Sequence, residues 1–142
     1  MKPQPTPETA PYWEAARAGE LRVQRCLDCG RHYIDHLMCY DAFAHLPLYM
    51  LEDLGFTGYG ESGAFIAEGH TRPGGALPMN TNGGGLCYTH TGMYGMFAIQ
   101  EAVRQLRGEA DAQVPGAQLS FVQGVGIFFA AGASLVLAGR EP

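Results

Sequence analysis

Hydrophobic and polar positions divide the chain into a short polar beginning and a longer part in which strand and helix patterns alternate. Residues 1–11 hold four prolines and predict an extended arm. Pro11 stands where a helix can begin, and residues 12–21 carry apolar side chains among charged neighbours, which predicts a short amphipathic helix. Residues 21–26 alternate between apolar and polar side chains, so we expect a strand there.

The alternation of elements continues from residue 36 onward. Residues 36–43 predict a strand that ends in a polar turn. Residues 46–54 have apolar side chains at helical spacing, with Gly55 where a helix terminator is expected. A second short helix is predicted at about residues 61–69, and residues 77–85 form an extended segment that turns into glycines.

The longest helix is predicted over residues 91–107, with Gly108 as its terminator. One face of this helix carries the apolar side chains of Met96, Ile99, Val103 and Leu106. Two β-rich runs follow at about residues 118–123 and 127–138, separated by residues 124–126, and near-continuous apolar strands are typical of strands buried on both faces. The order of elements predicts an α/β layered fold with its glycine loops at one edge of the sheet.

Composition and charge narrow the class of protein. The 142 residues are 46% hydrophobic and 16% charged, which is enough for the core of one domain. A net charge of -5 with nine scattered Lys and Arg residues provides no basic stripe, so we expect no nucleic-acid partner. The longest apolar stretch, residues 127–137, is too short for a membrane span, and the first residues lack a secretory signal. We expect a cytoplasmic protein whose four cysteines are not in disulfides.

Residues 80–92, with the sequence NTNGGGLCYTHTG, carry the most information about function. A glycine cluster lets a ligand approach the backbone, and His90 lies just before the predicted helix, where helix-terminal amides can face an anion. Taken alone, however, the string favours a tight strand-to-helix turn with a merely polar histidine.

Several motifs in one order resemble the C-terminal half of thiolases, and most of all thiolases of the sterol-carrier-protein type. The motifs are YDAF at 40–43, LEDLGF at 51–56, GESG at 60–63, the glycine loop at 80–92, EAVRQLRG at 101–108 and the final Gly-x-Gly turn. The resemblance covers about three quarters of the chain. It implies a thiolase C-terminal domain at residues 34–142, a mixed sheet with helices, whose nucleophile-bearing partner half we expect to be missing.

Two departures from the thiolase pattern refine the expected chemistry. His90 matches the histidine of the thiolase Gly-His-Pro sequence but is flanked by Thr89 and Thr91. The turn that matches the thiolase Cys-x-Gly-Gly-Gly sequence is residues 122–126, which contain no cysteine. Claisen chemistry of the ordinary kind therefore lacks one proton-transfer group.

Residues 88–95, with the sequence YTHTGMYG, resemble the thiolase-like aldolases that shorten steroid side chains in actinobacteria. That resemblance implies retro-aldol cleavage of a β-hydroxyacyl-CoA, which needs a base, an acid and stabilisation of a thioester enolate. It assigns proton transfer to Tyr88 and Tyr40, and donors to the thioester oxygen to His90 and Asn80. Residues that bind the coenzyme A thioester are then Gly83, Gly84, Gly124 and Gly126.

Simpler interpretations stay open for some of these residues. Tyr40 can equally be an aromatic residue at the end of a strand that packs in the core. Tyr94, one helical turn beyond His90, is interpreted as a packing residue. Cys87 is interpreted as a small core residue, since no thiolase motif places a nucleophile there.

Residues 13–30 resemble the opening of the zinc-ribbon and OB-fold proteins that accompany thiolase-like enzymes. Cys26 and Cys29 match the first of their two zinc knuckles, but a closed zinc site needs four ligands and the second knuckle is missing. Cys39 could be a third ligand and His32 or His36 a fourth, but Cys39 lies in the strand that the thiolase resemblance predicts. Bound zinc is therefore the less favoured outcome. We therefore assign residues 1–33 to an arm, a helix and a partial zinc ribbon.

Three functions follow as hypotheses. The leading one is an acyl-CoA lyase or acyltransferase of thiolase type, acting on a bulky, steroid-type β-hydroxyacyl-CoA. The second is a non-catalytic fragment or assembly subunit of an acyl-CoA enzyme, and the third is a small zinc-binding module that rests on two cysteines alone. The expected partners are the acyl-CoA substrate and either a second copy of the chain or a thiolase-like or zinc-ribbon and OB-fold protein.

Overall fold

The computed structural model describes residues 10–18, 34–89, 93–126 and 130–139. Its helices are α1 (Ala10–Arg17), α2 (Leu46–Asp53), α3 (Ser62–Ala67), α4 (Gly84–Cys87) and α5 (Tyr94–Arg107). Its strands are β1 (His36–Cys39), β2 (Leu119–Gly126) and β3 (Ala131–Ala138). The predicted strand at 21–26 lies outside the described residues. None of the described helices is both long and apolar enough for a membrane span.

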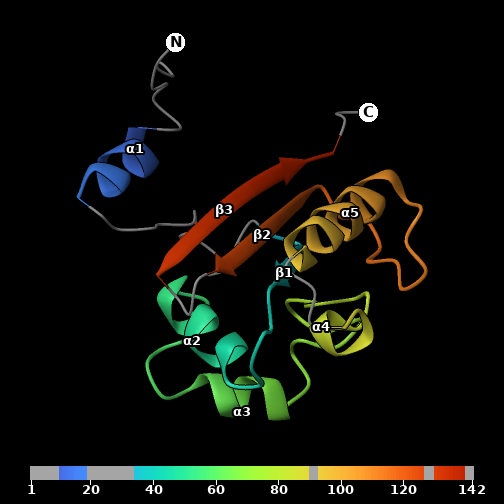
Figure 1. Cartoon of the computed structure of the whole chain (residues 1–142), viewed down its shortest axis with the longest axis horizontal. Helices are drawn as coiled ribbons and strands as arrows, with labels where there is room; N and C mark the ends of the chain where they lie inside the picture. The colour runs from blue at the N-terminus through green and yellow to red at the C-terminus, as the bar shows by residue number, and fades with distance from the viewer. Residues whose placement is uncertain (1–9, 19–33, 90–92, 127–129, 140–142) are drawn as a thin grey trace.

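The strands form one mixed sheet in the order β1, β2, β3 (Figure 1). β1 runs parallel to β2, with Leu37 opposite Phe121, and β3 runs antiparallel to β2. On the other side of β1, Leu37 forms a parallel bridge with Met79, so the segment before the glycine loop lies beside the sheet. The α/β layered architecture predicted from the sequence is therefore confirmed.

The period of two along the strands creates two different faces. Leu37, Cys39 and Phe121 pack with residues of α2 in one hydrophobic cluster. Met38 and Val122 point the other way and pack against α5 in a second cluster. The sheet is thus covered by helices on both faces around β1 and β2, which gives three layers.

Local signals account for the helix limits. Pro47 lies in the first turn of α2, where a missing N–H leaves no helical bond unmade. Gly55 follows the end of α2 with a φ of 76°, and Gly108 follows α5 with a φ of 73°, both in the left-handed region that glycine adopts without strain. These terminators were predicted from the sequence and are confirmed.

The buried face of α5 differs from the prediction. The buried residues are Tyr94, Ala98, Glu101, Ala102 and Gln105, whereas Met96 is 63% exposed. Alanines allow the helix axis to approach the sheet closely, and the two buried polar residues are hydrogen-bonded inside. The buried face is therefore rotated from the predicted one, although Ile99 of the predicted face is partly buried and still packs against the cluster on the sheet.

The two C-terminal strands also differ from the prediction. Residues 124–126 do not separate the strands but belong to β2, where Gly124 pairs with Ala133 and Gly126 with Ala131. β3 is exposed along most of its length rather than buried on both faces. The apolar side chains of β3 are therefore not explained by burial against the part of the chain that the structure describes.

Candidate functional site

Three tyrosines converge at the carboxyl end of β1. Tyr40 follows the strand, and its ring stacks on that of Tyr94 with 5.1 Å between the ring centroids. The ring of Tyr88 lies 6.1 Å from that of Tyr94 and stacks on Phe97 at 4.8 Å. Tyr94 is fully buried, as expected of a packing residue, whereas Tyr40 and Tyr88 are only partly buried. The two tyrosines predicted for proton transfer therefore flank one buried ring.

A shallow hollow of about 290 Å³ lies beside Tyr40. Its lining includes Gly95 at the beginning of α5 and, from the sheet, Gly124, Gly126 and Ala131. Two of the four glycines predicted to bind the thioester thus share a hollow with a predicted catalytic tyrosine. Gly83 and Gly84 do not line it.

The glycines of the loop approach Asp41 closely. The backbone N–H of Gly85 donates to Asp41 Oδ1 at 2.5 Å, and a Cβ atom on Gly84 would lie 2.3 Å from Asp41 Oδ2. Gly84 also has a φ of 70°, and Gly83 a φ of 94°. A protein carboxylate, rather than a ligand, thus accounts for the missing side chain at Gly84.

Asn80 connects the loop to β1. Its Oδ1 accepts a hydrogen bond from the backbone N–H of Cys39 at 2.9 Å, and its Nδ2 donates to Cys39 Sγ at 3.6 Å. The residue has a φ of 49°, a left-handed conformation that asparagine tolerates better than most residues. The carboxamide therefore positions the loop, and Nδ2 has a second hydrogen that, as far as the described residues show, can be donated to another acceptor.

A buried polar network fixes the middle of the loop, and the sequence analysis missed it. Thr81 Oγ1 donates to Glu101 Oε1 at 2.6 Å, and Gln105 Nε2 donates to Thr81 Oγ1 at 3.0 Å. His36 bonds to Thr81 through Nε2 and to Ser120 through Nδ1, each at 2.9 Å. The sequence contains part of the signal for this network, because Glu101 and Gln105 are four residues apart and therefore share one face of α5.

Hydrogen-bond accounting assigns the tautomer of His36. Thr81 has one hydrogen, which goes to Glu101, so its oxygen accepts from His36 and Gln105. His36 therefore carries its proton on Nε2, and its Nδ1 accepts from the hydroxyl of Ser120. Burial lowers the pKa of His36 to about 4 although Glu101 opposes the shift, so this imidazole is neutral at pH 7.

Asn82 lies between the loop and Tyr94. Its Oδ1 accepts from the Tyr94 hydroxyl at 3.3 Å and from the backbone N–H of Gly84 at 3.0 Å. Burial, with Asp41 nearby, raises the pKa of Tyr94 above its ordinary value. Asn82 Nδ2 is buried and, within the part of the chain that the structure describes, has no hydrogen-bond partner.

The cysteines differ in their surroundings. Cys39 is fully buried, and burial and the charge of Asp41 raise its pKa to about 12, which keeps the thiol protonated and unreactive as a nucleophile at pH 7. Cys87 is exposed, which contradicts its interpretation as a core residue; its sulfur packs over Gly83, where a Cβ atom would lie 2.4 Å from Sγ.

The predicted metal ligands Cys26 and Cys29 lie outside the described residues, as do His32 and the predicted catalytic residue His90. Both ring nitrogens of His36 are engaged in hydrogen bonds to protein groups. Among residues 10–18, 34–89, 93–126 and 130–139 there is no group of three potential metal ligands.

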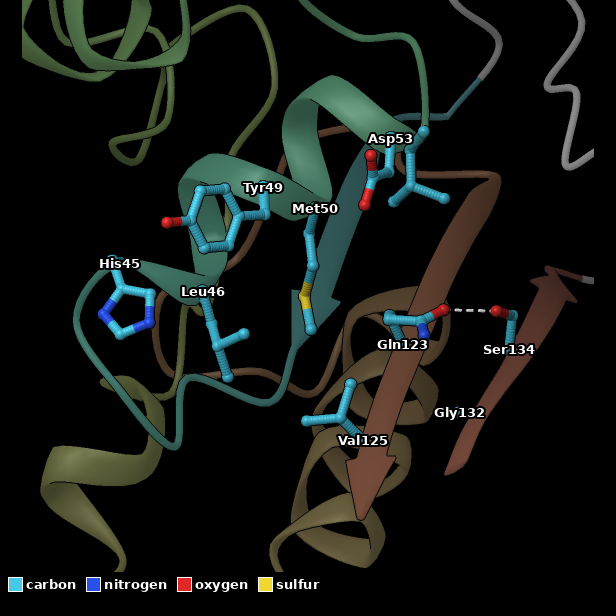
Figure 2. A pocket seen from close by; sticks show the side chains of 10 residues that line it. His45, Leu46, Tyr49, Met50, Asp53, Gln123, Val125, Gly132 and Ser134 are labelled. Atoms are coloured by element: carbon cyan, nitrogen blue, oxygen red, sulfur yellow. Dashed lines mark hydrogen bonds between the residues drawn. The ribbon is translucent and has the colours of Figure 1, made fainter. Parts of the chain in front are cut away.

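A second hollow, of about 470 Å³, lies on the opposite face of the sheet between α2 and the β2–β3 pair (Figure 2). Its lining includes the apolar side chains of Leu46, Met50 and Val125. His45 and Tyr49 stand on the helix side, and Figure 2 shows Ser134 on the strand side, bonded to Gln123. The tyrosine cluster around Tyr94 does not line this hollow.

Comparison with known proteins identifies relatives that are much longer than this chain. A lyase of Mycobacterium tuberculosis named 17-hydroxy-3-oxo-4-pregnene-20-carboxyl-CoA lyase is 48% identical over 81 residues, which are 56% of this chain and 20% of the relative. A steroid side-chain-cleaving aldolase of Thermomonospora curvata is 49% identical over 79 residues, which are 54% of this chain and 19% of the relative. An acetyl-CoA acetyltransferase of Methanothermobacter thermautotrophicus is 38% identical over 95 residues, 66% of this chain and 25% of the relative.

A solved structure of an aldolase has a fold similar to that of this chain. The chain superimposes on an Ltp2-ChsH2(DUF35) aldolase with a TM-score of 0.66 and 38% identity, over 78% of this chain and 28% of that one. The chain thus spans between about a fifth and about a quarter of its curated relatives.

A family model extends the similarity over most of the chain. The model for thiolase C-terminal domain-like proteins matches residues 12–139. The match begins before the predicted domain boundary at residues 33–34. This boundary and the partial zinc ribbon stay predictions. The thiolase resemblance of the sequence motifs is confirmed. The chain belongs to the thiolase C-terminal domain-like family.

Proposed function

We propose that this chain supplies part of the active site of a thiolase-type acyl-CoA lyase, which cleaves a bulky, steroid-type β-hydroxyacyl-CoA by a retro-aldol reaction. The observation that carries the proposal is the placement of Tyr40 and Tyr88 around one buried ring, with Tyr40 lining a hollow that Gly124 and Gly126 also line. The names of two relatives, a CoA lyase and a side-chain-cleaving aldolase, support the reaction class.

The reaction needs two proton transfers and no covalent nucleophile. A base removes the proton of the β-hydroxyl group, the C–O bond becomes a carbonyl, and the bond between the α- and β-carbons breaks. Its electron pair passes into the thioester as an enolate, which an acid then protonates at the α-carbon. The products are a ketone and a shortened acyl-CoA. We assign the two proton transfers to Tyr88 and Tyr40 without deciding which residue is the base.

The enolate oxygen needs hydrogen-bond donors. We assign this role to His90 and, through the free hydrogen of its Nδ2, to Asn80, whose other contacts fix the loop on Cys39. Gly124 and Gly126 would let the thioester approach the strand backbone. Gly83 and Gly84 keep their predicted role only if the thioester also contacts the loop around Asp41. Zinc takes no part in this proposal.

The remainder of the active site would come from a partner chain or from the part of a longer protein that the relatives possess. Large apolar side chains stand exposed on α4 and at the beginning of α5, with Leu86 93%, Met93 65% and Met96 63% exposed. Exposed apolar clusters of this kind mark protein interfaces. The structural neighbour is named after two components, which supports an assembly of this chain with a thiolase-like or a zinc-ribbon and OB-fold protein. We further propose a cytoplasmic location, which free thiols suit.

A second candidate function is a non-catalytic assembly subunit of an acyl-CoA enzyme. It is favoured by the same exposed side chains. Cleavage of a β-hydroxyacyl-CoA by the purified chain would exclude it.

The Tyr88→Phe variant tests the assignment. It removes one hydroxyl and keeps the ring that stacks on Phe97, so we expect the melting temperature to stay nearly unchanged and the cleavage rate to fall by a factor of about 100 or more. Tyr49→Phe, on the exposed side of α2, is the matched control and should cleave at the unaltered rate. Equal rates for Tyr88→Phe and the parent chain would refute the role of Tyr88.

A further inference from the structure

The outer edge of β3 is open. In the part of the chain that the structure describes, β3 is the last strand of the sheet and no strand pairs on its other side. Its sequence, AGASLVLA, contains no charged residue and no proline, and Leu135 and Val136 are 45% and 55% exposed. Proteins usually protect such edges with charges, prolines or bulges, because unpaired N–H and C=O groups recruit another strand.

The hydrogen-bonding direction of β3 can be assigned. Gly139 donates its N–H to the carbonyl of Gln118, the residue opposite it in the register. Because bonded and non-bonded pairs alternate along an antiparallel ladder, the odd-numbered residues of β3 bond to β2. The N–H and C=O groups of Gly132, Ser134, Val136 and Ala138 therefore point to the open edge.

We propose that this edge pairs with the β3 edge of a second copy of the chain, antiparallel and about a two-fold axis at Ser134. A two-fold axis perpendicular to the sheet keeps each face continuous, so opposing residues must point to the same face. Both this condition and the bonding direction require even-numbered residues to lie opposite even-numbered ones.

The side chains favour the register centred on Ser134. In that register three small residues lie opposite larger ones: Gly132 faces Val136, Ala133 faces Leu135, and Ala131 faces Leu137. A register centred one residue further would instead place Leu135 against itself. Without charged side chains on the strand, no like-charge pair opposes either arrangement.

The pairing has a consequence for the hollow between α2 and the sheet. Gly132 and Ser134 line its strand side, and Figure 2 shows them on the strand that forms this boundary. A second copy would place its Val136 beside Gly132 and so extend the apolar lining across the axis. The hollow is therefore incomplete in one copy of the chain. The exposed residues at the beginning of α5 belong to the other face and stay free for a different partner.

Charged substitutions at Ser134, on the axis, test the proposal. The pairing of two strand edges is a small interface, so a dissociation constant of about 10 to 100 µM is expected. Sedimentation velocity between about 1 and about 500 µM protein covers this range. Ser134→Lys and Ser134→Glu each place two like charges opposite one another, so each should weaken dimerisation at least tenfold. An equimolar mixture of the two variants should recover dimers. Ala64→Lys, on the exposed side of α3, is the control and should dimerise like the parent chain.

A cross-link defines the register. Ser134→Cys should form a disulfide between two copies under mild oxidation, because directly opposite bonded residues lie about 5.5 Å apart at their Cα atoms. Peptide mapping must then find the link between residue 134 of both copies. A chain that stays monomeric over the whole range, a dimer that ignores both charges, or a link confined to other cysteines would overturn the proposal. If the β3 edge instead binds another part of the same chain or another class of protein, the chain will stay monomeric over the whole concentration range, which overturns the proposal.

Discussion

The buried imidazole of His36 makes the stability of this chain depend on pH in a predictable direction. In the native state the ring is fully buried, its pKa is lowered to about 4, and its Nδ1 accepts from Ser120. In the unfolded chain the same ring takes up a proton near its ordinary pKa of 6.5. Protonation would place a hydrogen on Nδ1, opposite a hydroxyl that already donates.

The sign follows from proton uptake. Between pH 6.5 and about 4 the unfolded state binds a proton at His36 that the native state does not, so unfolding is favoured as the pH falls. The stabilisation by the neutral ring is fully present above pH 6.5. Taking the two pKa values together, the loss between pH 7.5 and 5.0 is about 2 kcal/mol, and its limit below pH 4 is about 3 kcal/mol.

Urea unfolding at both pH values measures this loss. Carboxyl groups titrate in the same range, so the informative quantity is the difference between the parent chain and His36→Gln, which cannot titrate. The parent chain should lose about 2 kcal/mol more than His36→Gln when the pH is lowered. Ser120→Ala keeps the titrating ring and should keep most of the pH slope, while its stability falls by about 1 kcal/mol at pH 7.5. Equal slopes for the parent chain and His36→Gln would refute the assignment of a neutral, buried ring.

Two further predictions concern the glycine loop and the cysteines. Gly84→Ala should destabilise the chain by about 2 kcal/mol or more in urea unfolding, because it adds strain at positive φ and a clash with the carboxylate that holds the loop. Gly116→Ala, with a φ of 70° and open space around it, should cost only about 1 kcal/mol, and equal losses would exclude the clash. In the native chain a thiol reagent should modify Cys87 rapidly and Cys39 only after unfolding, as peptide-resolved mass spectrometry can measure; early labelling of Cys39 would contradict its burial.

The sequence predicted those features that local signals determine. The ends of α2 and α5 follow from glycines in the left-handed region, and the order of elements follows from alternating periodicities. The motif order also grouped Tyr40 with Tyr88, and the rings of both contact that of Tyr94 although the two residues are far apart in the chain. Each of these predictions needs only neighbouring residues or a known pattern.

The features that the sequence analysis missed depend on partners distant in the chain. The inward face of α5 carries Ala98 and Glu101 rather than the larger Met96, because close approach to the sheet and a hydrogen-bond network decide its orientation. The Glu101 network takes its partners from the glycine loop and β1, which periodicity does not reveal. Likewise, an apolar strand at an open edge has the same pattern as one that is buried.

Product analysis of the cleavage reaction tests the central claim most directly. The purified chain is incubated with a steroid-type β-hydroxyacyl-CoA, and ketone and acyl-CoA products are measured by mass spectrometry with and without added free coenzyme A. A retro-aldol reaction at Tyr40 and Tyr88 predicts equal amounts of ketone and shortened acyl-CoA without any added coenzyme A. Cleavage that requires free coenzyme A, or cleavage that continues at an unchanged rate in a Tyr40→Phe, Tyr88→Phe double variant, would contradict the account.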